Sequence, residues 1–595
     1  MPRSDEIEAQ VSSERATGRW GNGPLTSDDG AGLAAALKRS LNGKTTTVGN
    51  MLDATASRFP DTEALIFYDH RLSLDQSQRT SYREYRQTVD QLAKSLMALG
   101  VNKGDHVAIW MPNCPEWAFA QMATGKIGAA NVSINTMLKT HETEYILQQS
   151  DSTTLLIADE FLGTDYMAML GELAPELQAS EPGSLNAARL PLLKNVITLS
   201  RSDRSRKFPG TITFDELMRM GDTVSDEALA ARQGSVAEDD VAQILYTSGT
   251  TGLPKGAALT QKGVIENSYY FGIGLGCHHG DIYINPQPLF HIGCSHLGTY
   301  CSITLGLTLI TVDRWNPQRN LQIIQKERTT TICGTPTHFI TMMQHPDFDQ
   351  YDVSSLRTGI MGGSACPVQL VRDVISKMHV RDLTITFGQT ETCGCITQTR
   401  RDAPPELRAE TVGVAQPGVE VAIKDPATNE TLPPGEVGEI CARSSNIMKG
   451  YYKNPQATAS AIDAEGWLHL GDLGSIDDDG NLRFRGRLKD MIIVGGENVY
   501  ASEVELFLEK HPKVIAAHVI GVPDAKFGEV TMAYLETSED VTFDEIHAFC
   551  KGRIASFKIP RYIANNVQLP LTPSAKVQKF RLREMAIATL GLREQ

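Results

Sequence analysis

The segment Tyr246-Thr-Ser-Gly-Thr-Thr-Gly-Leu-Pro-Lys-Gly256 carries the strongest signal in this chain. An apolar run, residues 241–245, precedes it and predicts a buried strand. Its glycines allow a tight bend that brings backbone N–H groups close to an anion. Its Ser and Thr hydroxyls and Lys255 add hydrogen-bond donors and a positive charge suited to phosphate oxygens. The segment therefore predicts a loop that holds a polyphosphate, and the alternative is a solvated turn between two strands.

Composition limits the kind of protein this chain can be. A length of 595 residues is too great for one hydrophobic core, so two or more domains are expected. The hydrophobic fraction of 41% and the charged fraction of 21% are typical of a globular enzyme. A net charge of −15 argues against a nucleic-acid-binding protein, because such proteins carry a basic surface. Any site for an anionic nucleotide must therefore gather its cations locally.

Cysteine usage and the absence of targeting patterns indicate the compartment. The ten cysteines form no CxxC pair, which favours reduced thiols over disulfides or a zinc site. Cys393 and Cys395 are better interpreted as core or pocket thiols than as nucleophiles. No apolar stretch approaches the ~18 residues of a membrane span, and the acidic N-terminal residues do not resemble a signal or transit peptide. A cytoplasmic protein without a transmembrane segment is expected.

The pattern along the chain predicts an α/β fold in three parts. Residues 1–46 are polar and weakly periodic and predict an N-terminal extension, residues 47–488 a large N-terminal domain, and residues 489–595 a small α+β domain. Helix-like periodicity at residues 50–59 and 82–99 alternates with short apolar runs, which predicts parallel sheets covered on both faces. Those runs are residues 64–67, 107–110, 154–157, 196–199 and 308–312.

The pattern changes twice in the last third of the chain. From about residue 419, short strands separated by turns predict a β-rich subdomain, and the acidic run 477–479 predicts a solvated hairpin turn rather than a calcium site. In the last domain, Ser502 is expected to cap a helix. Strands at residues 516–520 and 532–535 and a helix at residues 543–554 are expected to follow it.

A second motif, Phe387-Gly-Gln-Thr-Glu391, follows the strand-like residues 383–386. The aromatic ring of Phe387 can stack on a flat base, and Gly388 permits a sharp turn. The hydroxyl of Thr390 can donate to a phosphate, and the carboxylate of Glu391 can hold a hard cation such as Mg²⁺. Later in the chain, Asp472 stands in a Gly-Asp pair that predicts a carboxylate on a tight turn, suited to two ribose hydroxyls.

In order and spacing, these segments resemble the adenylate-forming superfamily: acyl-CoA synthetases, aryl-CoA ligases, peptide-synthetase adenylation domains and firefly luciferases. The resemblance covers roughly residues 50–585. The first segment is not the common phosphate loop, because Lys255 is followed by Gly256 rather than by a hydroxyl residue. The resemblance implies a large domain of two α/β subdomains and a β-rich subdomain, followed by a small α+β domain that is mobile.

The resemblance also implies a role for individual residues. It implies nucleotide binding by Thr247, Ser248, Gly249, Thr250, Thr251, Gly252, Lys255, Gly362, Gly363, Ser364, Phe387, Gly388, Gln389, Asp472 and Arg487. Thr247 and Glu391 are the implied metal ligands, and Thr390, Glu391 and Lys576 the implied catalytic residues. Lys489 is the implied hinge, and Gly495, Gly496, Glu497 and Asn498 the implied CoA-binding residues. The implied acyl pocket includes His291, Gly293, Cys294 and Thr337.

Two of these assignments have a second interpretation. The family has Gly before its catalytic lysine, whereas this chain has Ala575. If the alignment with the family motif shifts, Lys579 takes the catalytic role in place of Lys576. His291 either gates the substrate or is a buried histidine whose hydrogen bonds are satisfied internally.

The reaction implied is an ATP-dependent ligation of a carboxylic acid to CoA through acyl-AMP. Mg²⁺ is the implied cofactor, and ATP and CoA are the implied co-substrates. The small residues near His291 favour a fatty acid, medium-chain or otherwise bulky and apolar. Aryl, alicyclic or sterol-derived acids are alternative substrates, and a carrier protein is an alternative acceptor. The residues also leave open a luciferase-like oxygenase and a non-catalytic nucleotide-binding regulator. A homodimer is expected only by analogy with the family.

Overall fold

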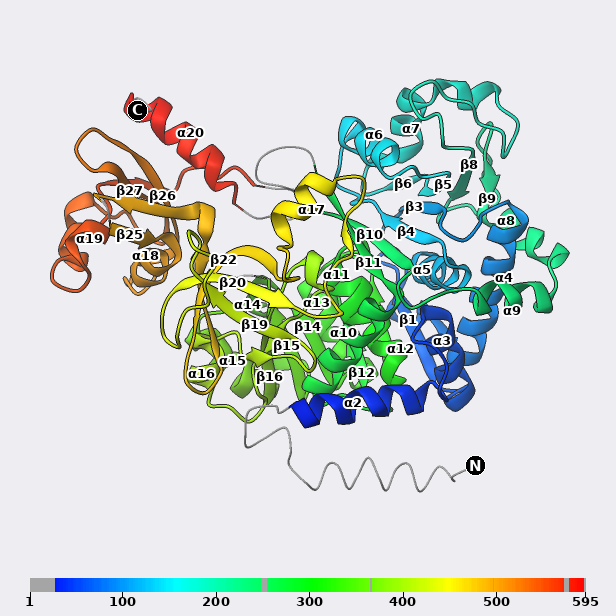
Figure 1. Cartoon of the computed structure of the whole chain (residues 1–595), viewed down its shortest axis with the longest axis horizontal. Coiled ribbons are helices and arrows are strands. Elements are labelled where there is room, and N and C mark those ends of the chain that lie inside the picture. The colour runs from blue at the N-terminus through cyan, green and yellow to red at the C-terminus, as the bar shows by residue number, and fades with distance from the viewer. Residues whose placement is uncertain (1–26, 248–253, 364–365, 496, 572–576, 593–595) are drawn as a thin grey trace. The chain divides into compact units, whose positions relative to one another are not determined.

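The computed structural model describes residues 27–247, 254–363, 366–495, 497–571 and 577–592, and the side chains from residue 32 onward (Figure 1). The chain divides into two compact units. The first contains Met1–Val421, Ala442–Leu468 and Asp479–Asn481, and the second contains Ala422–Cys441, His469–Asp478 and Leu482–Gln595. The predicted boundary between residues 488 and 489 lies within the second unit and stays a prediction.

The first unit contains two large sheets with mainly parallel cores, as the alternating pattern predicts. The nine-stranded sheet has the order β18-β17-β16-β15-β14-β12-β13-β1-β2. Its strands are β18 (Val414–Ala415), β17 (Thr397–Gln398), β16 (Asp382–Phe387), β15 (Thr358–Gly362), β14 (Thr331–Gly334), β12 (Ile282–Ile284), β13 (Thr308–Val312), β1 (Glu63–Tyr68) and β2 (Gln78–Ser81). The six strands from β16 to β1 are parallel, and antiparallel strands flank them.

The eight-stranded sheet has the order β21-β11-β10-β4-β3-β5-β8-β9. Its strands are β21 (Gly450–Tyr451), β11 (Lys255–Thr260), β10 (Val241–Thr247), β4 (Ala130–Ser133), β3 (His106–Trp110), β5 (Thr154–Ala158), β8 (Asn195–Leu199) and β9 (Ile212–Thr213). It is parallel from β10 to β9, and β11 and β21 add antiparallel strands at one end.

Helices cover these sheets and bury their apolar faces. Helix α5 (Pro115–Ile127) is buried along almost its whole length and packs against α3 (Val48–Arg58) and α4 (Tyr82–Ala98) (Figure 1). The nine-stranded sheet has its own apolar core, to which α13 (Pro317–Glu327), α14 (Pro336–Met343) and α15 (Val368–Lys377) contribute. Buried strands covered by helices on their faces are the usual solution for parallel sheets.

The predicted extension, residues 1–46, contains a helix that the weak periodicity did not reveal. Helix α2 (Ser27–Ser40) packs against α10 (Gln261–Gly274). Leu37 and Leu41, four residues apart, are almost fully buried. Leu41 comes directly after α2, and its N–H still bonds to the carbonyl oxygen of Leu37 at 3.1 Å, so both side chains lie on one face of this segment.

The second unit contains most of a four-stranded sheet and a separate α+β region. The four-stranded sheet has the order β19-β20-β22-β23, from β19 (Glu420–Lys424), β20 (Gly438–Arg443), β22 (Leu468–Ile476) and β23 (Leu482–Arg487). It confirms the predicted β-rich region. The acidic run 477–479 lies in the turn between antiparallel β22 and β23, as predicted.

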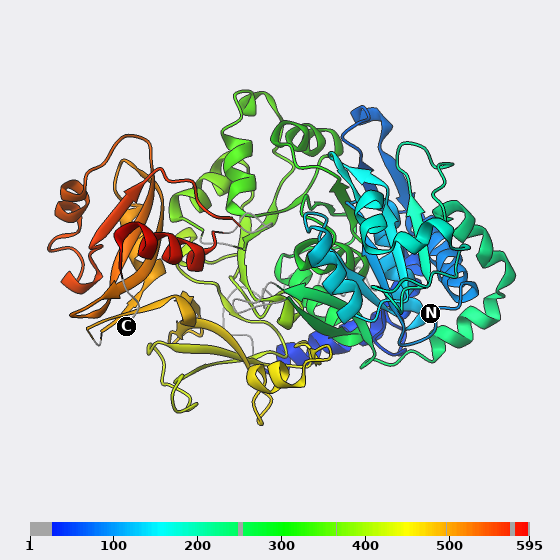
Figure 2. The same ribbon diagram turned by 90° about the horizontal axis from the view of Figure 1, so that it is seen from above.

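The C-terminal α+β region has a five-stranded sheet with the order β25-β24-β27-β26 and β28 beside β27. Its strands are β25 (Glu497–Tyr500), β24 (Met491–Val494), β27 (Gly528–Thr537), β26 (Val514–Asp524) and β28 (Tyr562–Asn565). Helices α18 (Ala501–Leu508) and α20 (Lys579–Leu590) pack against β26, and α19 (Phe543–Cys550) contributes to the same apolar core. Figure 2 shows α20, in red, lying across the orange strands of this sheet.

The prediction that Ser502 caps a helix is wrong. Helix α18 begins at Ala501, Tyr500 is its N-cap, and no side chain caps it. Ser502 lies inside the helix, and its hydroxyl donates instead to the carbonyl oxygen of Arg485 in β23. A serine near a helix start can bond either to the helix itself or to a neighbouring strand, and only the tertiary contact decides between them.

Candidate active site

The described ends of the phosphate-loop segment are held in a strand pair. Thr247 is the last residue of β10 and Lys255 the first of β11, and the two are directly opposite in the antiparallel ladder. Five predicted phosphate-binding residues, Ser248, Gly249, Thr250, Thr251 and Gly252, lie outside the described residues, as do Ser364, Gly496, Ala575 and Lys576. The strand predicted at residues 241–245 is therefore confirmed, and it extends to Thr247.

The first and second motifs meet at the carboxylate of Glu391. This residue lies in a short 3₁₀ helix, Thr390–Thr392, and is 8% exposed. Its Oε1 accepts hydrogen bonds from Thr247 Oγ1 at 3.2 Å and from the hydroxyl of Tyr451 at 2.8 Å. The two predicted metal ligands are thus in contact although 144 residues separate them. An oxygen-only set with a buried carboxylate suits a hard cation such as Mg²⁺.

Tyr451 is a site residue that the sequence analysis missed. It lies in β21, opposite Ala257 of β11, and the Nζ of Lys255 is 5.2 Å from the centre of its ring. Burial raises the pKa of Tyr451, and the charge of Glu391 raises this pKa further, so the hydroxyl stays protonated and donates. Its contact with Glu391 follows from strand pairing with β11, and no local pattern around Tyr451 announces it.

The predicted adenine side lies at the carboxyl ends of adjacent parallel strands. Gly362 ends β15 and Phe387 ends β16, and Gly362 pairs with Thr386 in the ladder. Gly363 has a φ of +86°, a left-handed conformation that favours glycine. The carboxyl ends of strands in open parallel sheets are where such folds bind ligands. The structure therefore brings these predicted residues together at one edge.

Gly388 is required for a reason other than the one predicted. Its φ is not positive, but a Cβ added here would lie 2.5 Å from the carbonyl oxygen of Gly394. The neighbouring backbone N–H of Gln389 donates to Thr392 Oγ1 at 2.9 Å, which fixes the short helix that carries Thr390 and Glu391. Close packing, rather than a special turn conformation, selects glycine at this position.

Asp472 lies in the second unit, within strand β22 and not on a tight turn as predicted. The left-handed residue is its neighbour Gly471, with a φ of +67°. Asp472 is 1% exposed and pairs with Arg487, its partner across the β22–β23 ladder, with Nε 3.1 Å from Oδ1. Because the carboxylate of Asp472 is buried and paired with an exposed arginine, this residue does not lie in an ordinary surface turn.

The predicted hinge and CoA-binding residues lie farther along the same unit. Lys489 is in a 3₁₀ helix, Leu488–Asp490, and burial lowers its pKa. Gly495, with a φ of +61°, lies between the antiparallel strands β24 and β25, and the exposed residues Glu497 and Asn498 begin β25. Gly495, Glu497 and Asn498 are exposed at the end of this hairpin. The roles of the hinge and CoA-binding residues stay predictions.

The residues predicted for the acyl pocket differ in their exposure to solvent. His291 is exposed, and its Nδ1 accepts from the backbone N–H of Gly293 at 3.1 Å, so the interpretation as a buried histidine is wrong. Thr337 is also exposed. A Cβ at Gly293 would lie 1.9 Å from Gln287 Oε1, so a larger residue there would require the side chain of Gln287 to move. Cys294 is fully buried, and burial raises the pKa of its thiol.

The interpretation of Cys393 and Cys395 as core or pocket thiols agrees with their burial. All ten cysteines are buried, and none forms a disulfide in the described residues. Burial raises the pKa of the Cys395 thiol to about 12 and also raises the pKa of Cys393. Thiols that stay protonated are poor nucleophiles.

A buried histidine that the sequence analysis did not consider connects the two motifs. His296 lies in a π-helix, Ser295–Tyr300, and is fully buried. Its Nε2 is 2.8 Å from Gln243 Oε1 in β10, and its Nδ1 is 3.2 Å from the carbonyl oxygen of Cys393, just after Glu391. Burial lowers the pKa of His296 to about 3, so the ring is neutral. A π-helical turn often marks a functional site.

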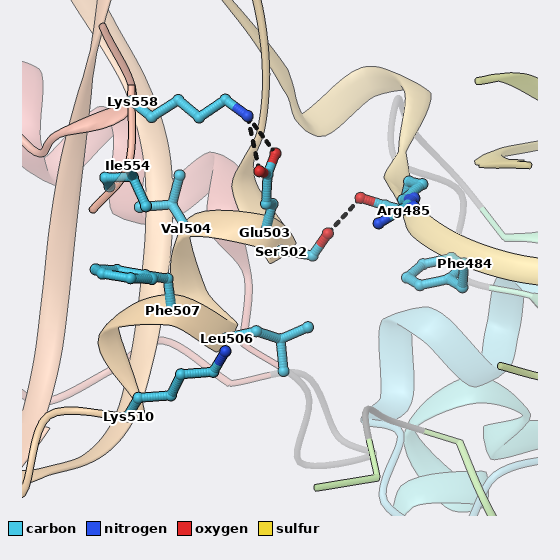
Figure 3. Close-up of a pocket in the computed structure, with 10 residues that line it drawn as sticks. All are labelled: Phe484, Arg485, Ser502, Glu503, Val504, Leu506, Phe507, Lys510, Ile554 and Lys558. Atoms are coloured by element: carbon cyan, nitrogen blue, oxygen red, sulfur yellow. Dashed lines mark hydrogen bonds and ion pairs between the residues drawn. The ribbon is translucent and has the colours of Figure 1, made fainter. Parts of the chain in front are cut away.

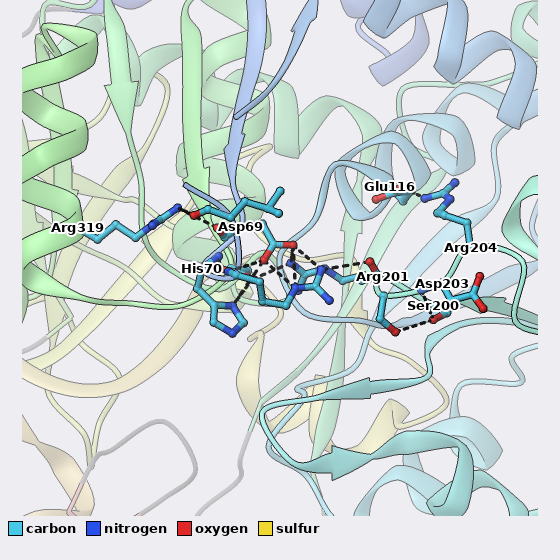
Figure 4. A network of polar contacts seen from close by, with 12 residues as sticks. Asp69, His70, Glu116, Ser200, Arg201, Asp203, Arg204 and Arg319 are labelled. Carbon is cyan, nitrogen blue, oxygen red and sulfur yellow. Dashed lines mark hydrogen bonds and ion pairs between the residues drawn. The ribbon is translucent and has the colours of Figure 1, made fainter. Parts of the chain in front are cut away.

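A charged network joins the two sheets of the first unit (Figure 4). Arg201, which follows β8, contacts Asp69 after β1 and Asp313 after β13, each at 2.7 Å. His70 Nδ1 is also 2.7 Å from Asp313. Asp69, His70 and Asp313 have the composition of a metal site, but Arg201 pairs with both carboxylates and Arg71 pairs with Asp69 as well. This group is therefore structural.

A pocket of about 270 Å³ lies in the second unit between α18 and β23 (Figure 3). Phe507 and Ile554 form part of its apolar wall, and Lys558 Nζ binds both carboxylate oxygens of Glu503 at 2.7 Å. Of the predicted CoA-binding residues that the structure describes, Gly495, Glu497 and Asn498, none lines it.

Comparison with known proteins gives the family. The model of the AMP-binding enzyme matches residues 52–452, and that of the AMP-binding enzyme C-terminal domain matches residues 503–576. YngI of Bacillus subtilis, provisionally named an acyl-CoA synthetase, is 43% identical over 92% of this chain and 98% of its own length. The mitochondrial medium-chain acyl-CoA ligase ACSF2 of Rattus norvegicus is 37% identical over 90% of this chain and 87% of its own.

A solved structure shows the same fold with a reaction intermediate. The o-succinylbenzoate CoA synthetase MenE of Bacillus subtilis, in complex with its acyl-adenylate, has a TM-score of 0.71 at 28% identity. The similarity covers 90% of this chain and 97% of MenE. The chain therefore belongs to the AMP-binding enzyme family, within the adenylate-forming superfamily, and is an AMP-forming acid–CoA ligase. No helix in the described part of the chain is long and apolar enough to cross a membrane.

Proposed function

We propose that this enzyme activates a medium-chain fatty acid with ATP and transfers the acyl group to CoA. In the first step, a carboxylate oxygen of the acid attacks the α-phosphate, acyl-AMP forms and pyrophosphate leaves. In the second step, the sulfur of CoA attacks the acyl carbon, the thioester forms and AMP leaves. The observation that carries the proposal is the contact of Thr247 and Tyr451 with the buried carboxylate of Glu391.

The residues of the first unit have distinct tasks in adenylation. Lys255 and the loop before it hold the leaving phosphates, and Thr390 donates to the α-phosphate. Glu391 and Thr247 offer the oxygen ligands for Mg²⁺, which when bound offsets the negative charge that develops on the phosphates. Phe387 stacks on the adenine, and the backbone groups of Gly362 and Gly363 line the nucleotide.

The second unit supplies the groups that differ between the two steps. Asp472, which pairs with Arg487, accepts hydrogen bonds from the ribose hydroxyls. Lys576 approaches the carboxylate and phosphate during adenylation and stabilises the developing charge. Rotation about Lys489 then removes Lys576 and brings residues 495–498 to the pantetheine arm of CoA, so that one pocket serves both reactions.

Two considerations support the proposed substrate class. The rat relative with 37% identity is named a medium-chain acyl-CoA ligase. The residues that follow the exposed His291 include the small residues Gly293 and Cys294, which leave room for an apolar chain. Because a pocket discriminates by only ~1–3 kcal/mol per methylene, the preference for chain length is expected to be graded. The predicted cytoplasmic location and homodimer stay predictions.

Measuring the rate of pyrophosphate release with different acids tests the substrate class. Straight-chain acids from short to long, aromatic acids and alicyclic acids are compared, each with and without CoA. We expect the highest kcat/KM for a medium-chain acid and acyl-CoA as the product. A clear preference for an aromatic or alicyclic acid would overturn the substrate class, and acyl-AMP that CoA fails to discharge would point to a carrier protein as the acceptor.

A further inference from the structure

Three side chains with metal-ligating atoms meet on the four-stranded sheet of the second unit, whereas the residues assigned to Mg²⁺ belong to the first unit. Glu439 and Cys441 lie two residues apart on β20, so both point to the same face, and His469 lies on the adjacent strand β22. One ligand atom from each lies within 4.8 Å of the other two. The Nδ1 of His469 is 2.8 Å from Glu439 Oε2 and 3.4 Å from the sulfur of Cys441.

The chemistry of these atoms differs from that of the Glu391 site. A thiolate, an imidazole and a carboxylate together favour Zn²⁺ and related transition metals over Mg²⁺. Three protein ligands with a fourth position for water is a common arrangement around zinc. Glu439 and Cys441 are buried, whereas the side chain of His469 is 22% exposed, which gives an ion and a water molecule access.

The surrounding backbone orients one of the ligands. The N–H of Gly471 donates to Glu439 Oε1 at 3.0 Å, which leaves Oε2 directed towards His469. Backbone groups that fix a ligand in this way are a regular feature of metal sites. The other group with metal-site composition, Asp69, His70 and Asp313, lacks this freedom because Arg201 lies between its carboxylates.

We propose that Glu439, Cys441 and His469 form a binding site for one Zn²⁺ ion, with water as the fourth ligand. Binding releases the thiol proton of Cys441 to solvent. The imidazole offers the lone pair of Nδ1 and carries its proton on Nε2 instead. The ion thus replaces the hydrogen bond between His469 and Glu439, and its affinity falls in acid because protons compete for the same atoms.

The position of this site in the chain places it next to the proposed ribose ligand. Asp472 follows directly after Gly471, whose N–H bonds to Glu439. The metal site and its test do not depend on the proposed function.

Cobalt binding to the full-length chain, without a histidine tag and stripped of metal by a chelator, tests the proposal. Cobalt bound by a thiolate gives a charge-transfer band in the near ultraviolet. We expect one equivalent of Co²⁺ to produce this band and one equivalent of Zn²⁺ to remove it. Cys441→Ser should abolish the band, and His469→Gln should weaken Co²⁺ binding by about tenfold or more.

A matched variant and a folding check keep the test decisive. Cys550→Ser removes another buried thiol of the second unit and should leave the band unchanged. Circular dichroism and thermal unfolding establish that each variant is folded. If Cys441→Ser does not fold, Glu439→Gln replaces it, and this variant should keep the band but bind Co²⁺ more weakly. Absence of the band in the wild type, or its persistence in Cys441→Ser, overturns the proposal.

Discussion

The hydroxyl of Tyr451 donates a 2.8 Å hydrogen bond to the carboxylate of Glu391, the residue on which the two principal motifs converge. Thr247 reaches the same oxygen from the end of β10. This arrangement orders the predicted metal ligands without the metal, because each hydroxyl donates to the carboxylate that the cation needs. Such preorganisation lowers the cost of assembling the site when nucleotide binds.

Removing the charge of Glu391 should slow adenylation strongly. Glu391→Gln keeps the shape of the side chain but lowers its affinity for a hard cation, and we expect kcat for acid-dependent pyrophosphate exchange to fall roughly hundredfold or more. Glu406→Gln, at a carboxylate that pairs with Arg372 near the surface, is the control and should retain activity. Equal activity in both variants would show that Glu391 does not hold the metal.

Removing the hydroxyl of Tyr451 should have a smaller effect. Tyr451→Phe keeps the ring beside Lys255 but loses a hydrogen bond to a charged group, worth about 1.5–3 kcal/mol when buried. We expect the KM for Mg·ATP to rise roughly tenfold with a smaller change in kcat. Tyr452→Phe is the matched control, because that hydroxyl bonds to Asp151 instead. A rise in KM shared by both variants would argue against the assignment of Tyr451.

Separating the two half-reactions tests Lys576. Lys576→Ala should abolish adenylation and still form the thioester from acyl-AMP that is supplied. Lys579→Ala should adenylate normally, because the structure pairs Lys579 Nζ with Glu505 at 2.6 Å. The two variants are compared by pyrophosphate release and by thioester formation from acyl-AMP. Normal adenylation by Lys576→Ala would transfer the catalytic role to another residue.

The bond between Ser502 and Arg485 spans the predicted hinge. Because it connects α18 to β23 on either side of Lys489, rotation about that residue must break it. Ser502→Ala should therefore change the ratio of adenylation to thioester-formation rates by about two- to tenfold, the effect of one hydrogen bond. Thr542→Ala, which alters a helix cap in α19 remote from the hinge in sequence, is the control. If Ser502→Ala changes neither rate, this bond has no role in the transition.

The neutral His296 should make stability depend on pH. Its pKa is lowered to about 3 in the folded chain by burial, against 6.5 for an unperturbed histidine. The unfolded chain therefore binds a proton first, so the stabilising contribution is full above about pH 6.5 and is lost progressively as the pH falls towards 3. We expect wild type to lose roughly 1.4 kcal/mol per pH unit more than His296→Gln across this window.

Denaturant midpoints at pH 7, 6 and 5 measure this difference. The exposed His141→Gln should behave like wild type at every pH. The same pH dependence in wild type and His296→Gln would mean that His296 does not remain neutral in the folded chain.

Sequence patterns predicted the strands and motifs well where the signal was local. Strand β13, for instance, coincides with the apolar run at residues 308–312. They failed where a residue's role depends on distant partners. Ser502 had the composition of a helix cap but bonds to β23, and His291 had two interpretations until its exposure was known.

The order and spacing of the motifs established the family and the type of reaction, because the residues that contact phosphate, base and metal are carried on short contiguous segments. Strand register decided the rest. It placed Tyr451 beside Lys255, set Asp472 against Arg487, and brought Glu439 and Cys441 to His469. A shift of one residue in any of these ladders would turn the side chain to the opposite face, so contacts of this kind exist only once the sheets have formed.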